Sequence, residues 1–170
     1  MSKTKNYLMD NEEEYAFENY AEEYNQQYRG WYLQKHKEAS EGFAITNIIF
    51  VYGTLQSGCG NNRLLHNCNL LGKAETDEEY YMSISGSVPF VNKNIHTTKI
   101  QGEVYEVADI DSFVQIDSLE SHPEWYKREV INVNLGGKLI KAWIYFNNET
   151  SNKISINDGN YKKYITARYD

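Results

Sequence analysis

Cysteine, proline and long apolar runs are scarce in this sequence, and their scarcity excludes several classes of protein. The 170 residues include two cysteines, Cys59 and Cys68, which have neither CxxC nor Cys/His spacing, so we expect no disulfide scaffold and no metal site. The apolar stretch at residues 48–52 is far too short to span a bilayer, and residues 1–10 lack the basic-then-apolar order of a secretory signal. We therefore expect a soluble cytoplasmic protein with one domain of ordinary size and an appendage.

An excess of basic residues is also missing. The formal net charge is -7, which argues against a general nucleic-acid binder, because such proteins carry a basic surface for the phosphate backbone. Residues 1–46 hold five basic and nine acidic residues, so more than half of the net negative charge lies in about a quarter of the chain. We expect two parts: an acidic, aromatic-striped helical extension over residues 1–45 and a main domain over residues 46–170.

The extension has the period of a helix. Its aromatic residues follow one another at spacings of 3, 4, 4 and 3 and so fall along one line; they are Phe17, Tyr20, Tyr24, Tyr28 and Trp31. Gly30 weakens the helix and marks a position where it could kink. We favour packing of this aromatic face on the main domain, since aromatic stripes are more often core than interface. Docking to a protein partner or another subunit is the alternative, and imitation of nucleic acid by the acids of residues 10–23 is a third hypothesis.

Beyond residue 45 the pattern changes to that of strands. Residues 87–89 are predicted as a turn, and Gly102 inside a strand indicates a bulge or a close backbone approach. A helix capped by Asp109 or Asp111 should run to about Leu119. The strand candidates are residues 47–52, 70–75, 79–85, 99–107, 129–135 and 139–146, the last two forming a hairpin. Because strands and helices do not alternate regularly, the predicted class is α+β.

Two segments have the composition of a functional site. The first strand ends in Tyr52-Gly53-Thr54-Leu55, where a sharp turn could direct successive backbone N–H groups into a cavity and bind a carboxylate or an oxyanion. Glu120 follows the predicted helix, and partial burial there would raise its pKa towards neutrality and suit a general base. The pattern also fits a solvated glutamate at a helix end, and Asp117, one turn earlier, is the nearest competing acid.

Several short blocks occur in a fixed order between residues 47 and 161. They are Val51-Tyr52-Gly53-Thr54-Leu55, then Gly58, Asn61 and Leu64 or Leu65, then Val88-Pro89, Gly102-Glu103-Val104-Tyr105, Ile116-Asp117-x-Leu119-Glu120-x-x-Pro123-x-x-Tyr126-x-Arg128 and Asp158-Gly159-Asn160-Tyr161. In this order the blocks resemble the gamma-glutamylcyclotransferase-like family, which includes the AIG2-like and gamma-glutamylamine cyclotransferase branches. Val88, where the family often has an aromatic residue, and Cys59-Gly60 in the loop depart from the family pattern on the leaving-group side.

The resemblance implies a small mixed β-barrel with flanking helices and a cavity at the Tyr-Gly-Thr-Leu corner. It also implies that the α-amine of a γ-glutamyl compound attacks its own γ-carbonyl, releasing 5-oxoproline and an amine or amino acid. The family's catalytic glutamate falls on Glu120, and the implied substrate-binding residues are Tyr52, Gly53, Thr54, Leu55 and Tyr126. No metal or cofactor is implied. Tyr126 equally fits a core tyrosine with a satisfied hydroxyl, and Arg128 fits a structural ion pair.

An alternative to the enzyme is a non-catalytic binding or inhibitor module on the same fold. In that case the pocket is retained, and the N-terminal helix is the surface that docks a partner. Among the other titratable residues, His122 is interpreted as a loop residue and Cys59 as a thiol without a catalytic role, because no base adjoins it in the sequence.

Overall fold

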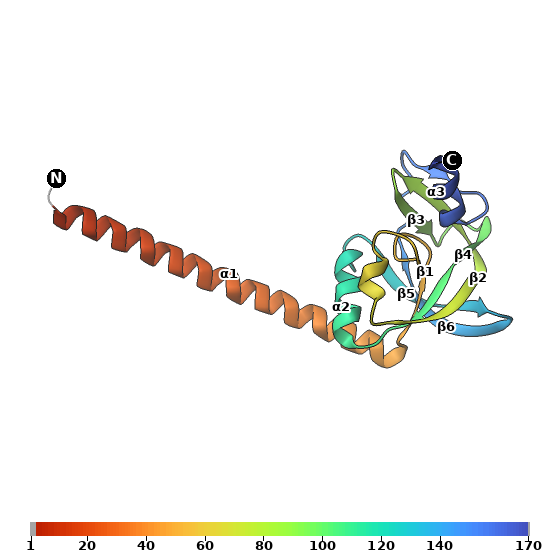
Figure 1. Ribbon diagram of the computed structural model, residues 1–170, viewed down its shortest axis with the longest axis horizontal. Helices are drawn as coiled ribbons and strands as arrows, with labels where there is room; N and C mark the ends of the chain where they lie inside the picture. The colour runs from red at the N-terminus through yellow and green to blue at the C-terminus, as the bar shows by residue number, and fades with distance from the viewer. Residues whose placement is uncertain (1–2, 170) are drawn as a thin grey trace. The chain divides into compact units, whose positions relative to one another are not determined.

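A computed structural model describes the backbone of residues 3–169 and the side chains of Ala16 and of residues 18–169 (Figure 1). Helix α1 spans Lys3–Ile45 and continues through Gly30 without an interruption. The chain divides into two compact units between Glu38 and Ala39. This division lies inside α1, seven residues before the boundary expected at 45/46, and the end of α1 belongs to the second unit.

The aromatic stripe of the first unit is exposed. Tyr20, Tyr24, Tyr28 and Trp31 keep 68%, 58%, 56% and 45% of their surface exposed. Phe17, the fifth member, lies outside the residues whose side chains are described. The described part of the stripe is therefore an exposed surface of the helix, in which the ring centres of Tyr28 and Trp31 lie 5.8 Å apart.

The second unit is a closed barrel of five strands, whose hydrogen-bonded order is β2, β4, β1, β6, β5 and back to β2. The strands are β1 (Ile48–Val51), β2 (Asn69–Ser85), β4 (Thr98–Glu106), β5 (Lys127–Leu135) and β6 (Lys138–Phe146). β1 runs parallel to β6, and the other neighbours are antiparallel. The mixed barrel with its helices confirms the predicted α+β class.

Two sequence expectations change at β2. The two short strands predicted over 70–75 and 79–85 form one long strand, with register shifts at Leu70/Gly72 and Glu75/Glu79 that let it bend around the barrel. The predicted turn at residues 87–89 is wrong at Val88 and Pro89, because they begin strand β3 (Val88–Asn92), which pairs with the far end of β2. Pro89 is tolerated in β3 because that strand lies at the edge of the strand order. Strand β7 (Ile154–Ser155) also pairs with β2.

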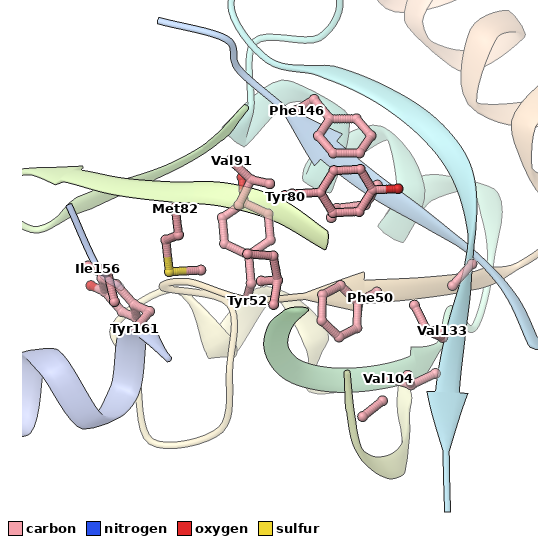
Figure 2. Packing of buried hydrophobic residues seen from close by; sticks show 14 of the residues in the cluster. Phe50, Tyr52, Tyr80, Met82, Val91, Val104, Val133, Phe146, Ile156 and Tyr161 are labelled. Carbon is pink, nitrogen blue, oxygen red and sulfur yellow. The ribbon is translucent and has the colours of Figure 1, made fainter. Parts of the chain in front are cut away.

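β1 is buried on both faces, as its continuous apolar run predicts. Phe50 and Tyr52 point into the barrel interior, where they meet Tyr80, Met82 and residues from the other strands (Figure 2). Ile49 and Val51 belong to a second cluster with α2 (Ile110–Leu119). Because β1 carries both clusters, the corner at its end has little freedom to move.

Helices α2, η1 (Asn62–Leu65) and α3 (Tyr161–Tyr169) complete the described part of the second unit. The side chain of Asp109 accepts a hydrogen bond of 2.7 Å from the backbone N–H of Ser112 and caps α2, one of the two caps considered from the sequence. The 3-10 helix η1 follows the loop after β1, and α3 ends the described chain. None of the described helices combines the length and the apolar character needed to cross a membrane.

Gly102 allows β4 to pass close to β1. A Cβ atom there would lie 2.3 Å from the carbonyl oxygen of Val51 and 2.8 Å from the ring of Phe50, which confirms the close approach predicted from the sequence.

We predict that Gly102→Ala lowers the free energy of unfolding by about 3 kcal/mol, because the clash is with backbone that cannot move aside. Urea denaturation measures this change. Gly60→Ala is the matched control, since no atom lies within 4 Å of a Cβ at Gly60, and it should stay within about 0.5 kcal/mol of the wild type. Equal stability of the two variants would contradict the close-packed barrel described here.

Candidate functional site

A pocket opens where β1 ends. Its volume is about 170 Å³, against the roughly 10–15 Å³ that one buried water requires, so it has room for a small organic ligand. Four segments build it: the end of β1 with the loop that follows, the start of β3, the chain from the end of α2 to Tyr126, and β6 through Tyr145. The lining residues are Phe50, Val51, Tyr52, Gly53, Thr54, Leu55, Asn61, Val88, Pro89, Leu119, Glu120, Trp125, Tyr126 and Tyr145.

The loop after β1 is fixed by its own hydrogen bonds. The side chain of Gln56 donates to the carbonyl of Tyr52 over 2.7 Å, and the side chain of Asn61 donates to the Thr54 hydroxyl over 2.9 Å. The side chain of Asn62 donates to the carbonyl of Leu55 over 2.8 Å. Amide side chains thus donate to two carbonyl groups and one hydroxyl group of this turn and hold its shape.

Within this loop, the backbone N–H groups of Thr54 and Leu55 donate to no acceptor among the residues that the structure describes. Both residues line the pocket. Two successive N–H groups without protein acceptors at a pocket wall are chemically able to hold a carboxylate or a developing oxyanion.

Position 53 requires glycine because Pro89 lies directly against it. A Cβ atom on Gly53 would lie 2.5 Å from Cγ of Pro89. The glycine and the Val-Pro pair, which are far apart in the sequence, are therefore in direct contact. Any larger residue at position 53 would push the loop or β3 away from the pocket.

Glu120 enters the pocket from the end of α2. It is the residue that ends the helix, and its backbone N–H still donates to Ile116 over 3.1 Å. The residue keeps a partly exposed surface at the pocket, but protein atoms crowd its carboxyl group. This burial, followed by the charge of Asp117, raises the pKa of Glu120 to about 7. No hydrogen-bond donor of the described residues is among the causes of this shift, so nothing in the described protein offsets the effect of burial on the Glu120 carboxyl group.

Asp117 is held in a buried network behind Glu120. Its side chain is fully buried and receives Nε of Arg128 over 2.9 Å and the hydroxyl of Tyr145 over 2.5 Å. The guanidinium of Arg128 also lies 4.5 Å from the ring centre of Trp143 and 4.9 Å from that of Phe113. The structural ion pair predicted for Arg128 is confirmed, and Asp117 is its partner rather than a rival base.

The two predicted pocket tyrosines have their hydroxyl groups occupied. The hydroxyl of Tyr52 donates to the carbonyl of Tyr145 over 2.6 Å, and that of Tyr126 donates to the carbonyl of Pro89 over 2.7 Å. Burial, with the charge of Glu120 among the lesser causes, holds the pKa of both phenols far above the usual value. The hydroxyl group of Tyr126 is therefore hydrogen-bonded, as expected of a core tyrosine, while its ring lines the pocket.

The structure brings all six predicted site residues to one pocket: Tyr52, Gly53, Thr54, Leu55, Glu120 and Tyr126. Sequence reasoning missed Tyr145 and Trp125 as lining residues. Tyr145 lies with Trp143 on the face of β6 that packs against α2 and has no motif of its own, and Trp125 is partly exposed at 49%. His122 lies outside the lining and accepts the backbone N–H of Arg128 at Nδ1. Cys59 also lies outside the lining, and burial raises the pKa of its thiol.

Comparison with known proteins places this site in a family. Residues 49–163 match the family described as gamma-glutamyl cyclotransferase, AIG2-like. A candidate gamma-glutamylcyclotransferase of Methanocaldococcus jannaschii is 41% identical over 118 residues, which cover 68% of this chain and 96% of that protein. Gamma-glutamylaminecyclotransferase of Bos taurus is 36% identical over 97 residues, which cover 52% of this chain and 57% of that protein.

Solved structures agree with this assignment. The crystal structure of an AIG2-like protein of Mus musculus matches with a TM-score of 0.55 and 25% identity, over 62% of this chain and 80% of that chain. The chain belongs to the AIG2-like gamma-glutamyl cyclotransferase family. This confirms the resemblance found in the ordered blocks.

We predict that Asp117→Asn lowers the free energy of unfolding by about 3–5 kcal/mol, because it leaves the buried Arg128 without its carboxylate. Thermal or chemical denaturation checks this loss. Glu129→Gln is the control, since its ion pair with Lys93 is more than one-third exposed on both sides and should contribute at most about 1 kcal/mol. Equal losses of unfolding free energy in the two variants would show that the buried Asp117–Arg128 pair contributes no more to stability than the exposed pair.

Proposed function

We propose that this protein is a gamma-glutamyl cyclotransferase that releases 5-oxoproline and a free amine. The observation that carries the proposal is a carboxyl group with a pKa of about 7, Glu120, lining the same pocket as the unpaired N–H groups of Thr54 and Leu55. A base that is active at neutral pH and a site for developing negative charge are the two groups that this cyclisation requires.

The first step is the attack of the substrate's α-amine on its own γ-carbonyl carbon. The amine is protonated at neutral pH and cannot attack, so the Glu120 carboxylate removes a proton. The amine nitrogen then forms a bond to the carbonyl carbon, and the carbonyl π electrons move to the oxygen. The N–H groups of Thr54 and Leu55 would stabilise that oxyanion or hold the substrate's α-carboxylate. Because the attack is intramolecular, a pocket that keeps the chain folded removes much of the entropic barrier.

The second step returns the proton. The attacking nitrogen, which is positively charged after forming its new bond, passes its second proton to the departing nitrogen. The oxyanion re-forms the carbonyl, the bond between this carbon and the departing nitrogen breaks, and the carboxyl group of Glu120 gives its proton to that nitrogen. The products are 5-oxoproline and the protonated amine, and Glu120 is again a carboxylate. A pKa near 7 suits both halves of the cycle, because the group must accept and donate a proton with similar ease.

The lining favours a leaving group without a carboxylate. Among the described residues, no lysine or arginine lines this pocket, and its outer wall is formed by Val88, Pro89 and the half-exposed Trp125. A leaving amino acid would bring an anionic group that finds no cation there, whereas a plain amine would not. This favours γ-glutamylamines over γ-glutamyl amino acids as substrates.

We predict that Glu120→Gln reduces 5-oxoproline release from a γ-glutamylamine by at least about 10³-fold, since the amide can neither accept nor return the proton. Release is measured by chromatography over a panel that also contains a γ-glutamyl dipeptide. Glu106→Gln, on an exposed side chain at the end of β4, should retain wild-type turnover. If the wild type and Glu120→Gln are equally inert over the panel, the proposed function fails.

A second prediction concerns stability, and it does not depend on finding the substrate. The pKa of Glu120 in the folded protein is about 7, above its ordinary value of 4.5, so stability is fully present below about pH 4.5 and is lost as the pH rises through 7. Glu120→Gln removes that loss and should be more stable than the wild type by about 3 kcal/mol at pH 8.

The difference should disappear near pH 4, where the wild-type carboxyl group is protonated in both the folded and unfolded states. Thermal unfolding followed at pH 4, 6 and 8 measures it. A constant difference across this range would mean that burial does not shift the titration of Glu120.

A further inference from the structure

The spacing of the aromatic stripe residues along α1 is symmetric, so it is the same from either end of the stripe. Its spacings of 3, 4, 4 and 3 are symmetric about Tyr24. Tyr20 and Tyr28 stand four residues on either side of Tyr24, and Phe17 and Trp31 stand seven residues on either side. An antiparallel pair of such helices, centred on Tyr24, therefore brings each stripe position opposite another stripe position. The four described members are 45–68% exposed and provide apolar surface for such a contact.

The charges of α1 are separated along its length. Residues 10–23 contain seven acidic residues and no basic one, whereas residues 24–37 contain three basic residues and no acidic one. A parallel pair of these helices would place the acidic segments against each other. An antiparallel pair places each acidic segment against the basic segment of its partner and also opposes the two helix dipoles.

One pair of exposed residues defines the register. Glu18 and Arg29 are eleven residues apart, which is three helical turns, so they lie along the same flank of α1. They stand six and five residues from Tyr24, on opposite sides of it. In the antiparallel pair centred on Tyr24, Glu18 of one helix reaches the level of Arg29 of the other, on the same side of the interface. The symmetry of the stripe and the pairing of Glu18 with Arg29 therefore both place the centre of the antiparallel pair at Tyr24.

We propose that α1 is a self-association surface that pairs antiparallel with a second copy of this chain, centred on Tyr24. The occupant is another copy rather than an unrelated protein, because the helix carries both halves of a complementary surface. A helix in water gains most of its stability by packing an apolar face, and this pairing supplies the packing for the stripe. The proposal is independent of the enzymatic function.

Cysteine cross-linking in the full chain tests the direction and the centre. In a background with Cys59 and Cys68 replaced by serine, Tyr24→Cys should form a disulfide-linked dimer under mild oxidation, because the two cysteines face each other at the centre. Trp31→Cys is the matched control, since its two copies would be fourteen residues apart, or about 21 Å along the axis, far beyond the roughly 7 Å limit for a disulfide. Non-reducing electrophoresis reads both results. Cross-linking of both variants would indicate a parallel pair and overturn the proposal.

Charge reversal tests the register without removing aromatic surface. Glu18→Lys and Arg29→Glu should each weaken the dimer about tenfold in sedimentation equilibrium, because each places two pairs of like charges in the interface. The double variant restores opposite charges and should return to within about twofold of the wild type.

Two outcomes would overturn the pairing directly. One is a wild-type chain that sediments as a monomer up to its solubility limit. The other is a double variant no tighter than the single variants. A monomer that binds a basic protein through residues 10–23 would also contradict self-association and would assign the surface to a partner. Release of 5-oxoproline by these variants should equal that of the wild type, which separates this inference from the proposed activity.

Discussion

The buried ion pair between Asp117 and Arg128 is the constraint on which the site depends. It joins the last turn of α2 to the first residues of β5, and the Tyr145 hydroxyl ties the same carboxylate to β6. Because Glu120 ends α2 only three residues after Asp117, the pair decides where the candidate base stands relative to the barrel. The pocket is assembled from separate segments, and the buried contact between Asp117 and Arg128 fixes the position of α2 relative to β5.

The same pair also sets the electrostatics of the pocket. Arg128 offsets the charge of Asp117, which is why a fully buried carboxylate is tolerated so close to Glu120. What remains of the Asp117 charge still disfavours ionisation of Glu120 and adds to the effect of burial. Thr54 and Leu55 line the same pocket, and their N–H groups have the complementary polarity. The pocket therefore combines a carboxyl group and backbone donors with a lining that is otherwise largely apolar and aromatic.

Much of this arrangement was readable from the sequence, for identifiable reasons. The buried strand, the hairpin at Gly136-Gly137 and the cap at Asp109 follow from local chemistry, and the ordered blocks indicated the family. The union of two predicted strands into β2 was not readable, because it depends on bulges that only barrel closure demands. Tyr145 was missed for a similar reason: its position beside Asp117 arises from pairing between distant strands. What covers the stripe on α1 was not readable either, because helical periodicity shows which residues share a face and not what that face contacts.

The parallel contact between β1 and β6 has a consequence for the order of events during synthesis. β1 leaves the ribosome early, but its neighbour β6 is complete only at Phe146, when most of the chain has been made. Its other neighbour, β4, also lies about fifty residues downstream. Contacts of such long sequence separation slow folding, because the closure entropy of the loop must be overcome before the contacts form. The apolar strand that supports the site therefore has no sheet partner until β4 has been made, and its exposure to chaperones during that interval follows from the barrel topology.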